Sequence, residues 1–188
     1  MCGWGLLRDK QSGLVCKIDL KKAYDWRDWD FPRWVLIKKG FGNRWIRWIM
    51  GCLDHPHFSV MTNGVSKEFF NSSRGICQDD PLSPFLFSLV ADAFSSLMSK
   101  SMSSSLIEGI QIGREGVHVS HLLFADNIIC FLKDSNEQVF HLKYILKIFE
   151  TISGLKVNFS KSSLVGIGVE EGVAYHYAFS NVLKWFRV

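Results

Sequence analysis

Two stretches of the sequence place a carboxylate at the end of an apolar run, where it could hold a cation. In HLLFADNIICF, residues 121–131, the apolar runs 122–125 and 128–132 flank the polar pair Asp126–Asn127. Two apolar runs around a polar pair predict a β-hairpin with its turn at that pair. Aspartate and asparagine are also ordinary turn residues, so this pair by itself does not require a function.

A second carboxylate in a similar position, Asp19, strengthens a functional interpretation. Asp19 lies near the end of the apolar run LVCKIDL, residues 14–20, which predicts a buried strand. An unpaired carboxylate among apolar residues costs free energy, so it needs a partner. Carboxylates at the ends of adjacent strands form a site for hard divalent cations, which take oxygen ligands and often bind substrate phosphates.

The remaining elements must bring these two strand ends together. Strands are predicted at 14–20, 58–62, 65–70, 106–112, 117–124, 128–132, 155–159 and 163–167, and helices at 31–39, 44–53, 85–98 and 135–151. Asp30, Ser83 and Ser135 are the predicted N-caps of three of these helices, and Gln138 would complete a capping box with Ser135. Asn63–Gly64 predicts the turn of the first hairpin.

This succession of strands and helices fits an α+β domain of two layers, in which helices cover one face of an antiparallel sheet. We expect an irregular lead-in over residues 1–13, one domain over 14–168 and a C-terminal tail over 169–188. The apolar residues of 44–53 include Trp45 and Trp48. These tryptophans are expected to pack against the sheet, and stacking on nucleic-acid bases is the alternative.

Composition narrows the class of protein. The 188 residues are 47% hydrophobic with a net charge of +4, which argues against disorder and is compatible with a nucleic-acid partner. Five cysteines without a CxxC spacing predict buried thiols in a reducing intracellular compartment, either nucleus or cytoplasm, and neither disulfides nor a zinc site. No apolar run approaches the ~20 residues that cross a bilayer, so no membrane partner is expected.

Four motifs resemble, in order and spacing, the palm motifs of reverse transcriptases. They are KIDLKKAYD (17–25), SSRGICQDDPLSPFLFSLVADA (72–93), FADN (124–127) and GLKVNFSKS (154–162). The chain resembles the polymerase of non-LTR (LINE-type) retrotransposons, particularly those common in plant genomes. The resemblance implies a polymerase palm domain over 14–168 that copies an RNA template from a DNA primer with deoxynucleoside triphosphates.

The resemblance also implies a role for the two carboxylates and their surroundings. Asp19 and Asp126 would hold two Mg²⁺ ions, and Asn127 would stand at the second position of the family's paired aspartates. Lys161 would lie near the nucleotide and neutralise or protonate the leaving pyrophosphate.

Three further residues would contact the incoming nucleotide or the template. Tyr24 would be the steric gate that leaves no room for a 2′-hydroxyl group. Gln78 would lie against the nucleotide, and Arg74 in the same loop would contact phosphate or template. The resemblance implies a truncated and degenerate copy as well, because the fingers and thumb segments of the full polymerase are not recognisable.

Three positions depart from the family pattern. Asn127 replaces the second aspartate of the pair, which removes one negative charge from the cation site. Asp79 stands where the family has glycine, and Cys77 stands where related sequences usually have arginine. The sequence therefore predicts an impaired reverse transcriptase. The alternatives are a non-catalytic nucleic-acid-binding remnant of a decayed retrotransposon and a globular fragment without function.

Overall fold

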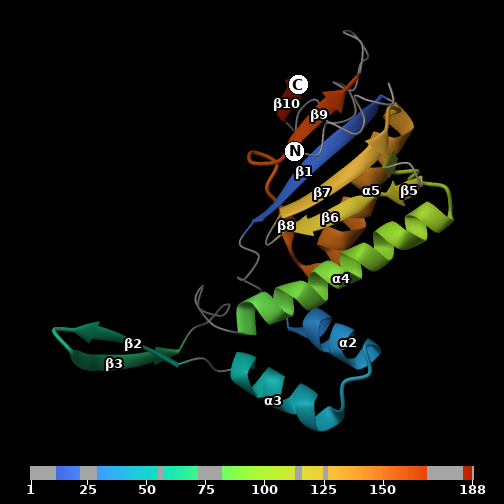
Figure 1. The fold of residues 1–188 in the computed structure, drawn as a ribbon. Helices are drawn as coiled ribbons and strands as arrows, with labels where there is room; N and C mark the ends of the chain where they lie inside the picture. The colour runs from blue at the N-terminus through green and yellow to red at the C-terminus, as the bar shows by residue number, and fades with distance from the viewer. Residues whose placement is uncertain are drawn as a thin grey trace.

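The computed structural model describes residues 12–21, 29–54, 57–71, 82–112, 116–124, 127–168 and 184–187. Its largest sheet has the strand order β10-β9-β1-β7-β6, and β8 pairs with the end of β1 (Figure 1). These strands are β1 (Gly13–Lys21), β6 (His121–Phe124), β7 (Asn127–Lys133), β8 (Lys156–Val157), β9 (Ser163–Ile167) and β10 (Lys184–Arg187). Paired strands in this sheet are antiparallel except β9 and β10, which are parallel.

Strand β1 lies in the middle of this sheet, and its two faces have different environments. The side chains of Leu14, Cys16, Ile18 and Leu20 are buried in the core. On the opposite face of β1, Val15 and Asp19 are partly buried, and Lys17 and Lys21 are exposed. Because side chains alternate across a strand, one face of β1 packs in the core and the other carries Asp19.

Helices α4 (Leu82–Ser103) and α5 (Asn136–Ser153) pack on the buried face of the sheet (Figure 1). Their apolar residues form one core with those of β1. Phe94 of α4 meets Phe149 of α5 edge to face, with ring centroids 5.2 Å apart. The predicted α+β architecture, helices over one face of an antiparallel sheet, is confirmed, and β10 adds a parallel strand at its edge.

Two more helices and two hairpins complete the described part of the chain. Helix α2 (Asp30–Lys38) packs against both α3 (Asn43–Asp54) and α4. Strands β2 (His57–Thr62) and β3 (Val65–Asn71) form a separate hairpin that projects away from the helices, and β4 (Ile110–Ile112) pairs with β5 (Val117–Val119) (Figure 1).

The turn between β2 and β3 has the predicted form. Asn63 and Gly64 have positive φ angles of 52° and 77°, the conformation that a two-residue hairpin turn needs and that these residue types tolerate.

Two of the predicted N-caps are wrong. Helix α2 begins at Asp30 itself, and Trp29 occupies the cap position without a side-chain hydrogen bond. Helix α4 begins at Leu82, so Ser83 and Pro84 both lie inside its first turn. Backbone N–H groups in a first turn have no partner within the helix, so a proline there removes no helical hydrogen bond.

The predicted capping box of α5 is formed only in part. Ser135 is the N-cap, as predicted, and its hydroxyl accepts a hydrogen bond from the Glu137 N–H at 3.2 Å. Gln138 is buried and accepts a hydrogen bond from the Glu108 N–H at 3.0 Å. The Gln138 side chain is therefore bonded to the distant residue Glu108, and not to the backbone of Ser135 as a capping box requires.

Helix α4 continues beyond its predicted end at residue 98 and includes part of the stretch predicted as a serine-rich loop. The hydroxyl groups of Ser101 and Ser103 donate to the carbonyls of Leu97 and Ser99 at 2.9 and 3.0 Å. Serine in a helix can bond to the preceding turn in this way, so these residues do not end α4.

By length and composition alone, α4 is long and apolar enough to cross a membrane. This corrects the expectation that no apolar run approaches the length needed to cross a bilayer. It has 22 residues, and its most apolar 18-residue segment has a mean hydropathy of 1.3. Within the structure, 44% of this segment is buried. The core helix of a globular domain can be equally long and apolar. Leu86, Val90, Phe94 and Met98, spaced four residues apart, are fully buried in the core. These contacts account for the apolar character of α4.

Two other predictions need correction. The predicted strand 117–124 is divided between β5 and β6 at Ser120, whose carbonyl accepts a hydrogen bond from the Phe131 N–H at 2.7 Å. In α3, Ile46 and Ile49 are buried as expected, but Trp45 and Trp48 are 49% and 56% exposed. The packing interpretation of these two tryptophans is therefore wrong.

Candidate functional site

Asp19 lies where the central strand changes partners. On one side β1 pairs with β7, and Asp19 is directly opposite Asn127. On the other side β9 pairs with β1 as far as Lys17, and β8 pairs with it from Leu20 onward. Asp19 is thus flanked by Asn127 and by the turn that connects β8 to β9.

This turn, residues 158–162, makes the hydrogen bonds that a neighbouring strand would otherwise make. The Asn158 N–H donates to the Asp19 carbonyl at 2.7 Å, and the Asp19 N–H donates to the Ser162 hydroxyl oxygen at 3.0 Å. The Asn158 carbonyl in turn accepts from the N–H groups of Lys161 and Ser162 at 3.0 and 2.9 Å. Both backbone groups of Asp19 are therefore bonded to the turn, which fixes the position of the residue.

The turn also holds the side chain of Asp19. The Asn158 amide nitrogen Nδ2 donates to Oδ2 of Asp19 at 2.8 Å, and the Ser160 hydroxyl donates to Oδ1 of Asn158 at 2.8 Å. Hydrogen bonds to an ionised acceptor are stronger than those between neutral groups. This bond favours one orientation of the Asp19 carboxylate, in which Oδ2 accepts the hydrogen bond from Asn158.

Sequence reasoning missed Asn158 and Ser162, although both belong to the motif GLKVNFSKS. The signal was an asparagine directly after a short strand and four residues before a serine, which favours a turn closed by side-chain hydrogen bonds. That pattern is common. Only the sheet reveals that this turn bonds to Asp19 rather than to its own neighbours.

The predicted hairpin around the second carboxylate is confirmed, with its turn one residue earlier than expected. Phe124 of β6 pairs with Asn127 of β7, so residues 125 and 126 connect the strands and Asn127 is the first residue of β7. Asp126 lies outside the described residues. The sequence places it directly before the residue that faces Asp19.

His121 fastens this hairpin to α4. Its ring nitrogens Nδ1 and Nε2 lie 2.9 Å from the hydroxyl oxygens of Ser120 and Ser95, and its ring meets that of Phe94 edge to face. Burial lowers the pKa of His121, so the neutral ring with one donor and one acceptor is favoured. His121 therefore links the first residue of β6 to the core helix.

The other predicted site residues are only partly visible. Lys161 is exposed and lies in the turn 158–162, next to the residues that bond to Asp19. Tyr24, Arg74, Gln78 and Asp79 lie outside the described residues. Among the residues that the structure describes, no three His, Cys, Asp or Glu side chains form a metal-binding group.

Two thiols lie in the core beneath the site. Cys16 and Cys130 are cross-strand neighbours in β1 and β7, and both are fully buried free thiols. Burial raises the pKa of Cys16 well above its usual value, with a smaller contribution from Cys130, and burial raises the pKa of Cys130 to about 12. Both thiols therefore stay protonated, and the protonated form is neither a nucleophile nor a metal ligand.

Similarity to a known protein family shows what kind of protein carries this site. Residues 5–175 match the model of the reverse transcriptase (RNA-dependent DNA polymerase) family. The chain belongs to this family. The predicted resemblance to the polymerases of non-LTR retrotransposons is confirmed as well, because retrotransposon R2 polyproteins are among its relatives.

Three relatives show how far the similarity to this reverse transcriptase domain extends. An uncharacterized mitochondrial protein of Arabidopsis thaliana is 34% identical over 73 residues, which are 39% of this chain and 60% of that protein. The Pol polyprotein of the Drosophila melanogaster element R2DM is 29% identical over 161 residues, which are 84% of this chain and 14% of the polyprotein. The R2 polyprotein of Popillia japonica is 28% identical over 160 residues, which are 85% of this chain and 22% of the polyprotein.

Solved structures support the fold. The apo telomerase of Candida tropicalis, truncated from its C-terminal domain, matches 89% of this chain and 33% of its own with a TM-score of 0.59 and 14% identity. The telomerase of Candida albicans in complex with a fragment of telomeric RNA matches 90% of this chain and 29% of its own, with the same TM-score and identity. The reverse transcriptase domain thus spans a small part of the retrotransposon polyproteins and telomerases that it matches.

Proposed function

We propose that this chain is the palm of an RNA-directed DNA polymerase whose divalent cations are held by Asp19 and Asp126. One observation carries the proposal. Asp19 of β1 lies directly opposite Asn127 of β7, and Asp126 directly precedes Asn127 in the sequence. Cross-strand neighbours project from the same face of a sheet, so Asp19 and Asn127 present oxygen ligands together, with Asp126 next to them in the sequence. Such ligands suit Mg²⁺.

The residues around this pair have complementary roles in the proposal. When bound, two Mg²⁺ ions neutralise the charge that develops on the transferred phosphoryl group. Asn158 holds the Asp19 carboxylate in one orientation through the 2.8 Å hydrogen bond, so the ligand is ordered before a cation binds. Lys161, in the same turn, would neutralise the leaving pyrophosphate.

Contacts with the nucleic acid and the nucleotide follow from the family motifs. Tyr24 would exclude ribonucleotides by occupying the space of the 2′-hydroxyl group. Gln78 would lie against the incoming nucleotide, and Arg74 would bind phosphate or template. The substrates would be a deoxynucleoside triphosphate, a DNA primer and an RNA template.

The proposal includes an impaired activity. Asn127 supplies a neutral carboxamide at a position where the family has a carboxylate, which weakens the attraction for divalent cations. Asp79 adds a negative charge beside the triphosphate. At about 5 Å and an effective dielectric constant near 20, repulsion with one phosphate charge is roughly 3 kcal/mol. Both substitutions act on the same bound nucleotide, so their effects are not simply additive.

A primer-extension assay tests the proposal. Magnesium-dependent incorporation of labelled deoxynucleotides on an RNA template is measured for the chain and for Asn127→Asp/Asp79→Gly. We expect incorporation near background for the chain, a clear gain for the double variant and loss of that gain when Asp19→Ala is added. A gain that persists with Asp19→Ala would show that Asp19 does not hold the catalytic cations.

Asn127 also favours a second candidate function. A site with a weakened attraction for cations can still belong to a protein that binds nucleic acid without copying it. In that case the double variant would gain no incorporation, while salt-sensitive binding to a primer–template would remain.

A further inference from the structure

One side of α5 packs in the core, and the opposite side carries a row of exposed apolar side chains. The row consists of Phe140, Tyr144, Ile148 and Ile152, which are 61%, 64%, 37% and 43% exposed. Residues four apart are neighbours on the surface of a helix, so these side chains form a continuous ridge. The ridge is about 18 Å long, because each residue of a helix rises about 1.5 Å.

The ridge leads into a groove between α2 and α4. The groove has a volume of about 370 Å³, and its apolar lining includes Phe31 and Trp34 of α2, Leu97 of α4 and Ile152 of α5. The rings of Phe31 and Trp34 are stacked, with centroids 6.2 Å apart. Ile152 belongs to both the ridge and the groove, and we call the two together the α5 surface.

The α5 surface differs from the scattered apolar residues that every protein exposes. Its side chains are contiguous along the ridge, and the ridge ends in a groove that can receive a further side chain. Contiguous apolar patches of this kind mark places where another molecule binds, because covering them removes apolar area from water.

Positive charge borders the α5 surface. Four exposed lysines surround it: Lys143 and Lys147 beside the ridge, and Lys38 and Lys100 in the lining of the groove. Among the described residues that line the groove, Asp92 is the one carboxylate, and it is paired with Lys39. Of the two acidic residues of α5, Glu150 is buried and Glu137 lies in the first turn. The border of the surface therefore has an excess of positive charge.

We infer that the α5 surface binds an acidic amphipathic helix of a partner protein. One apolar side chain of that helix would enter the groove, and others at helical spacing would cover the ridge. Its carboxylates would lie beside the lysines. A helix laid in an apolar groove is read through anchors of this spacing, and a ridge of about 18 Å matches a partner helix of about 12 residues or more.

Other occupants leave part of the surface unused. A second copy of the chain in a two-fold symmetric contact would bring the same lysines together, and like charges repel. A bilayer would cover the ridge but would not fill the groove. A nucleic acid would pair with the lysines and leave the ridge exposed. The inference goes beyond the proposed function, because none of the predicted site residues lies on the α5 surface.

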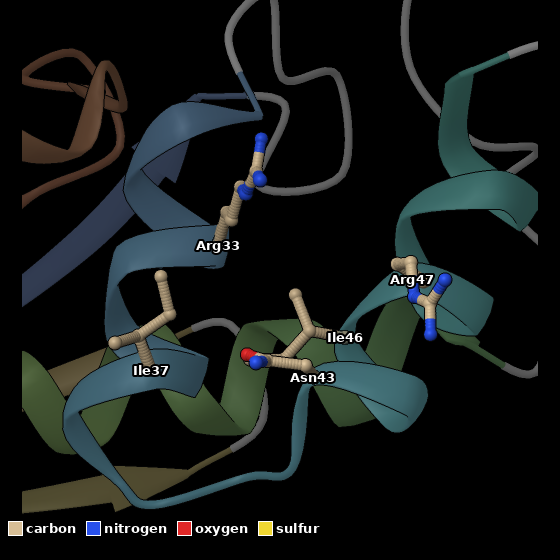
Figure 2. Close-up of a pocket in the computed structure, with 5 residues that line it drawn as sticks. All are labelled: Arg33, Ile37, Asn43, Ile46 and Arg47. Atoms are coloured by element: carbon tan, nitrogen blue, oxygen red, sulfur yellow. The ribbon is translucent and has the colours of Figure 1, made fainter.

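A second hollow, between α2 and α3, has the charge but lacks the apolar ridge. It has a volume of about 440 Å³, and Figure 2 shows the residues that line it, Arg33 and Ile37 of α2 with Asn43, Ile46 and Arg47 of α3. None of these described lining residues is aromatic, and none also lines the groove. Its two arginines therefore supply a control for charge at a place away from the α5 surface.

Fluorescence anisotropy of a designed peptide tests the inference. The probe is a fluorescein-labelled helix of about 18 residues, long enough to be partly helical in water, with leucines along one face and glutamates beside them. One reference peptide has lysine in place of each glutamate, and another has the same composition with its leucines distributed around the helix. The acidic amphipathic peptide should bind, more weakly as salt rises, and both references should bind at least about tenfold more weakly.

Substitutions on the ridge locate the binding site. Phe140→Ser/Tyr144→Ser should weaken binding of the acidic peptide at least about tenfold, since aromatic anchors dominate such interfaces. Trp45→Ser/Trp48→Ser makes comparable changes at exposed positions on α3 and should leave binding unchanged. Unchanged binding in Phe140→Ser/Tyr144→Ser, or equal weakening in both variants, would overturn the inference.

Charge reversal tests the lysines. Lys38→Glu/Lys100→Glu should lose the preference for the acidic peptide and bind the lysine peptide more tightly than the parent does, a gain that a misfolded chain cannot show. Arg33→Glu/Arg47→Glu makes the same change of charge at the hollow between α2 and α3. This control should alter either affinity by less than about twofold at physiological salt, where the Debye length is about 8 Å. A preference for the acidic peptide that survives Lys38→Glu/Lys100→Glu would contradict the inference.

Two further measurements distinguish the partner helix from the other occupants. Vesicles containing phosphatidylserine should not displace the acidic peptide, and the chain should sediment as a monomer at the concentrations of the titration. Displacement by vesicles, or a dimer that Phe140→Ser/Tyr144→Ser dissociates, would reject the partner helix in favour of a membrane or a second copy. Asp19→Ala should bind the peptide like the parent, so failure of the primer-extension test would reject the proposed function and leave this inference standing.

Discussion

Asn158 and Asp19 are 139 residues apart in the chain, yet Nδ2 of Asn158 donates a 2.8 Å hydrogen bond to Oδ2 of Asp19. The same asparagine bonds the Asp19 carbonyl through its N–H group. The last motif of the sequence thus orders the carboxylate of the first. A cation ligand that is held before binding costs less conformational entropy on binding, which is how neighbouring groups tune a metal site.

The first prediction concerns the energy of this contact. Asn158→Ala should lower the free energy of unfolding by about 1.5 kcal/mol, the lower end of the range for a hydrogen bond to a charged group, because the contact is only partly buried. A double-mutant cycle with Asp19→Ala isolates the pair, and urea denaturation supplies the four free energies. Asn136→Ala, which makes the same side-chain change at an exposed position on α5, is the matched control and should show no coupling with Asp19→Ala. A coupling energy near zero would show that the hydrogen bond does not order Asp19.

The second prediction concerns the two departures from the family pattern. Asn127→Asp should raise magnesium-dependent incorporation, and Asn127→Asp/Asp79→Gly should raise it further, because each removes an obstacle worth more than about 1.4 kcal/mol, or tenfold in rate. Single-turnover incorporation on an RNA template measures both gains. Asn136→Asp makes the same charge change at an exposed position on α5 and should have no effect. Equal gains from Asn136→Asp and Asn127→Asp would contradict a local effect at the cation site.

The third prediction concerns the buried thiols. Iodoacetamide at pH 8 should label the exposed Cys52 in the folded protein but leave Cys16 and Cys130 unmodified, which peptide mass spectrometry can distinguish. Their pKa values are raised in the folded state, so the stability that they contribute is complete below the ordinary thiol pKa and declines as pH rises toward about 12. Cys16→Ala/Cys130→Ala should lose less stability over this range. Rapid labelling of Cys16 would contradict the burial.

The fourth prediction compares two glycines with positive φ angles. Gly109 has φ of 68°, and a Cβ atom added there would lie 2.7 Å from the Val119 carbonyl oxygen. Gly154, with φ of 71°, has no atom within 4 Å of the same position. Gly154→Ala should cost about 1 kcal/mol from backbone strain, and Gly109→Ala at least about 1 kcal/mol more from the clash. Equal losses in thermal unfolding would show that the backbone of β5 moves away at no cost.

Sequence reasoning predicts the fold well where the determinants are local. The strand around Asp19, the turn at Asn63–Gly64 and the N-cap at Ser135 all follow from periodicity or from residues within a few positions. It fails at Ser83 and Gln138. For Gln138 the local cap competes with a tertiary hydrogen bond to Glu108. Helix α4 already begins at Leu82, so Ser83 lies inside its first turn and is not its N-cap.

For the candidate site, the sequence identifies Asp19 and the hairpin around Asp126, but not the residues that hold Asp19 in place. The hydrogen bonds of Asn158 and Ser162 join the turn 158–162 to Asp19 of β1. The turn and the strand are far apart in the sequence, so no local sequence pattern predicts that they are in contact. The exposed tryptophans of α3 illustrate the same limit. Helical spacing puts Ile46, Trp45 and Trp48 on one broad apolar face, while packing buries only the isoleucine of these three.

A titration with Mn²⁺, followed by the electron paramagnetic resonance signal of the free ion, tests most directly whether Asp19 belongs to a cation site weakened by Asn127. Mn²⁺ prefers the same oxygen ligands as Mg²⁺. We expect weak binding by the chain, clearly tighter binding by Asn127→Asp, and loss of that binding when Asp19→Asn is added. Unchanged affinity in Asn127→Asp, or affinity that survives Asp19→Asn, would contradict the account.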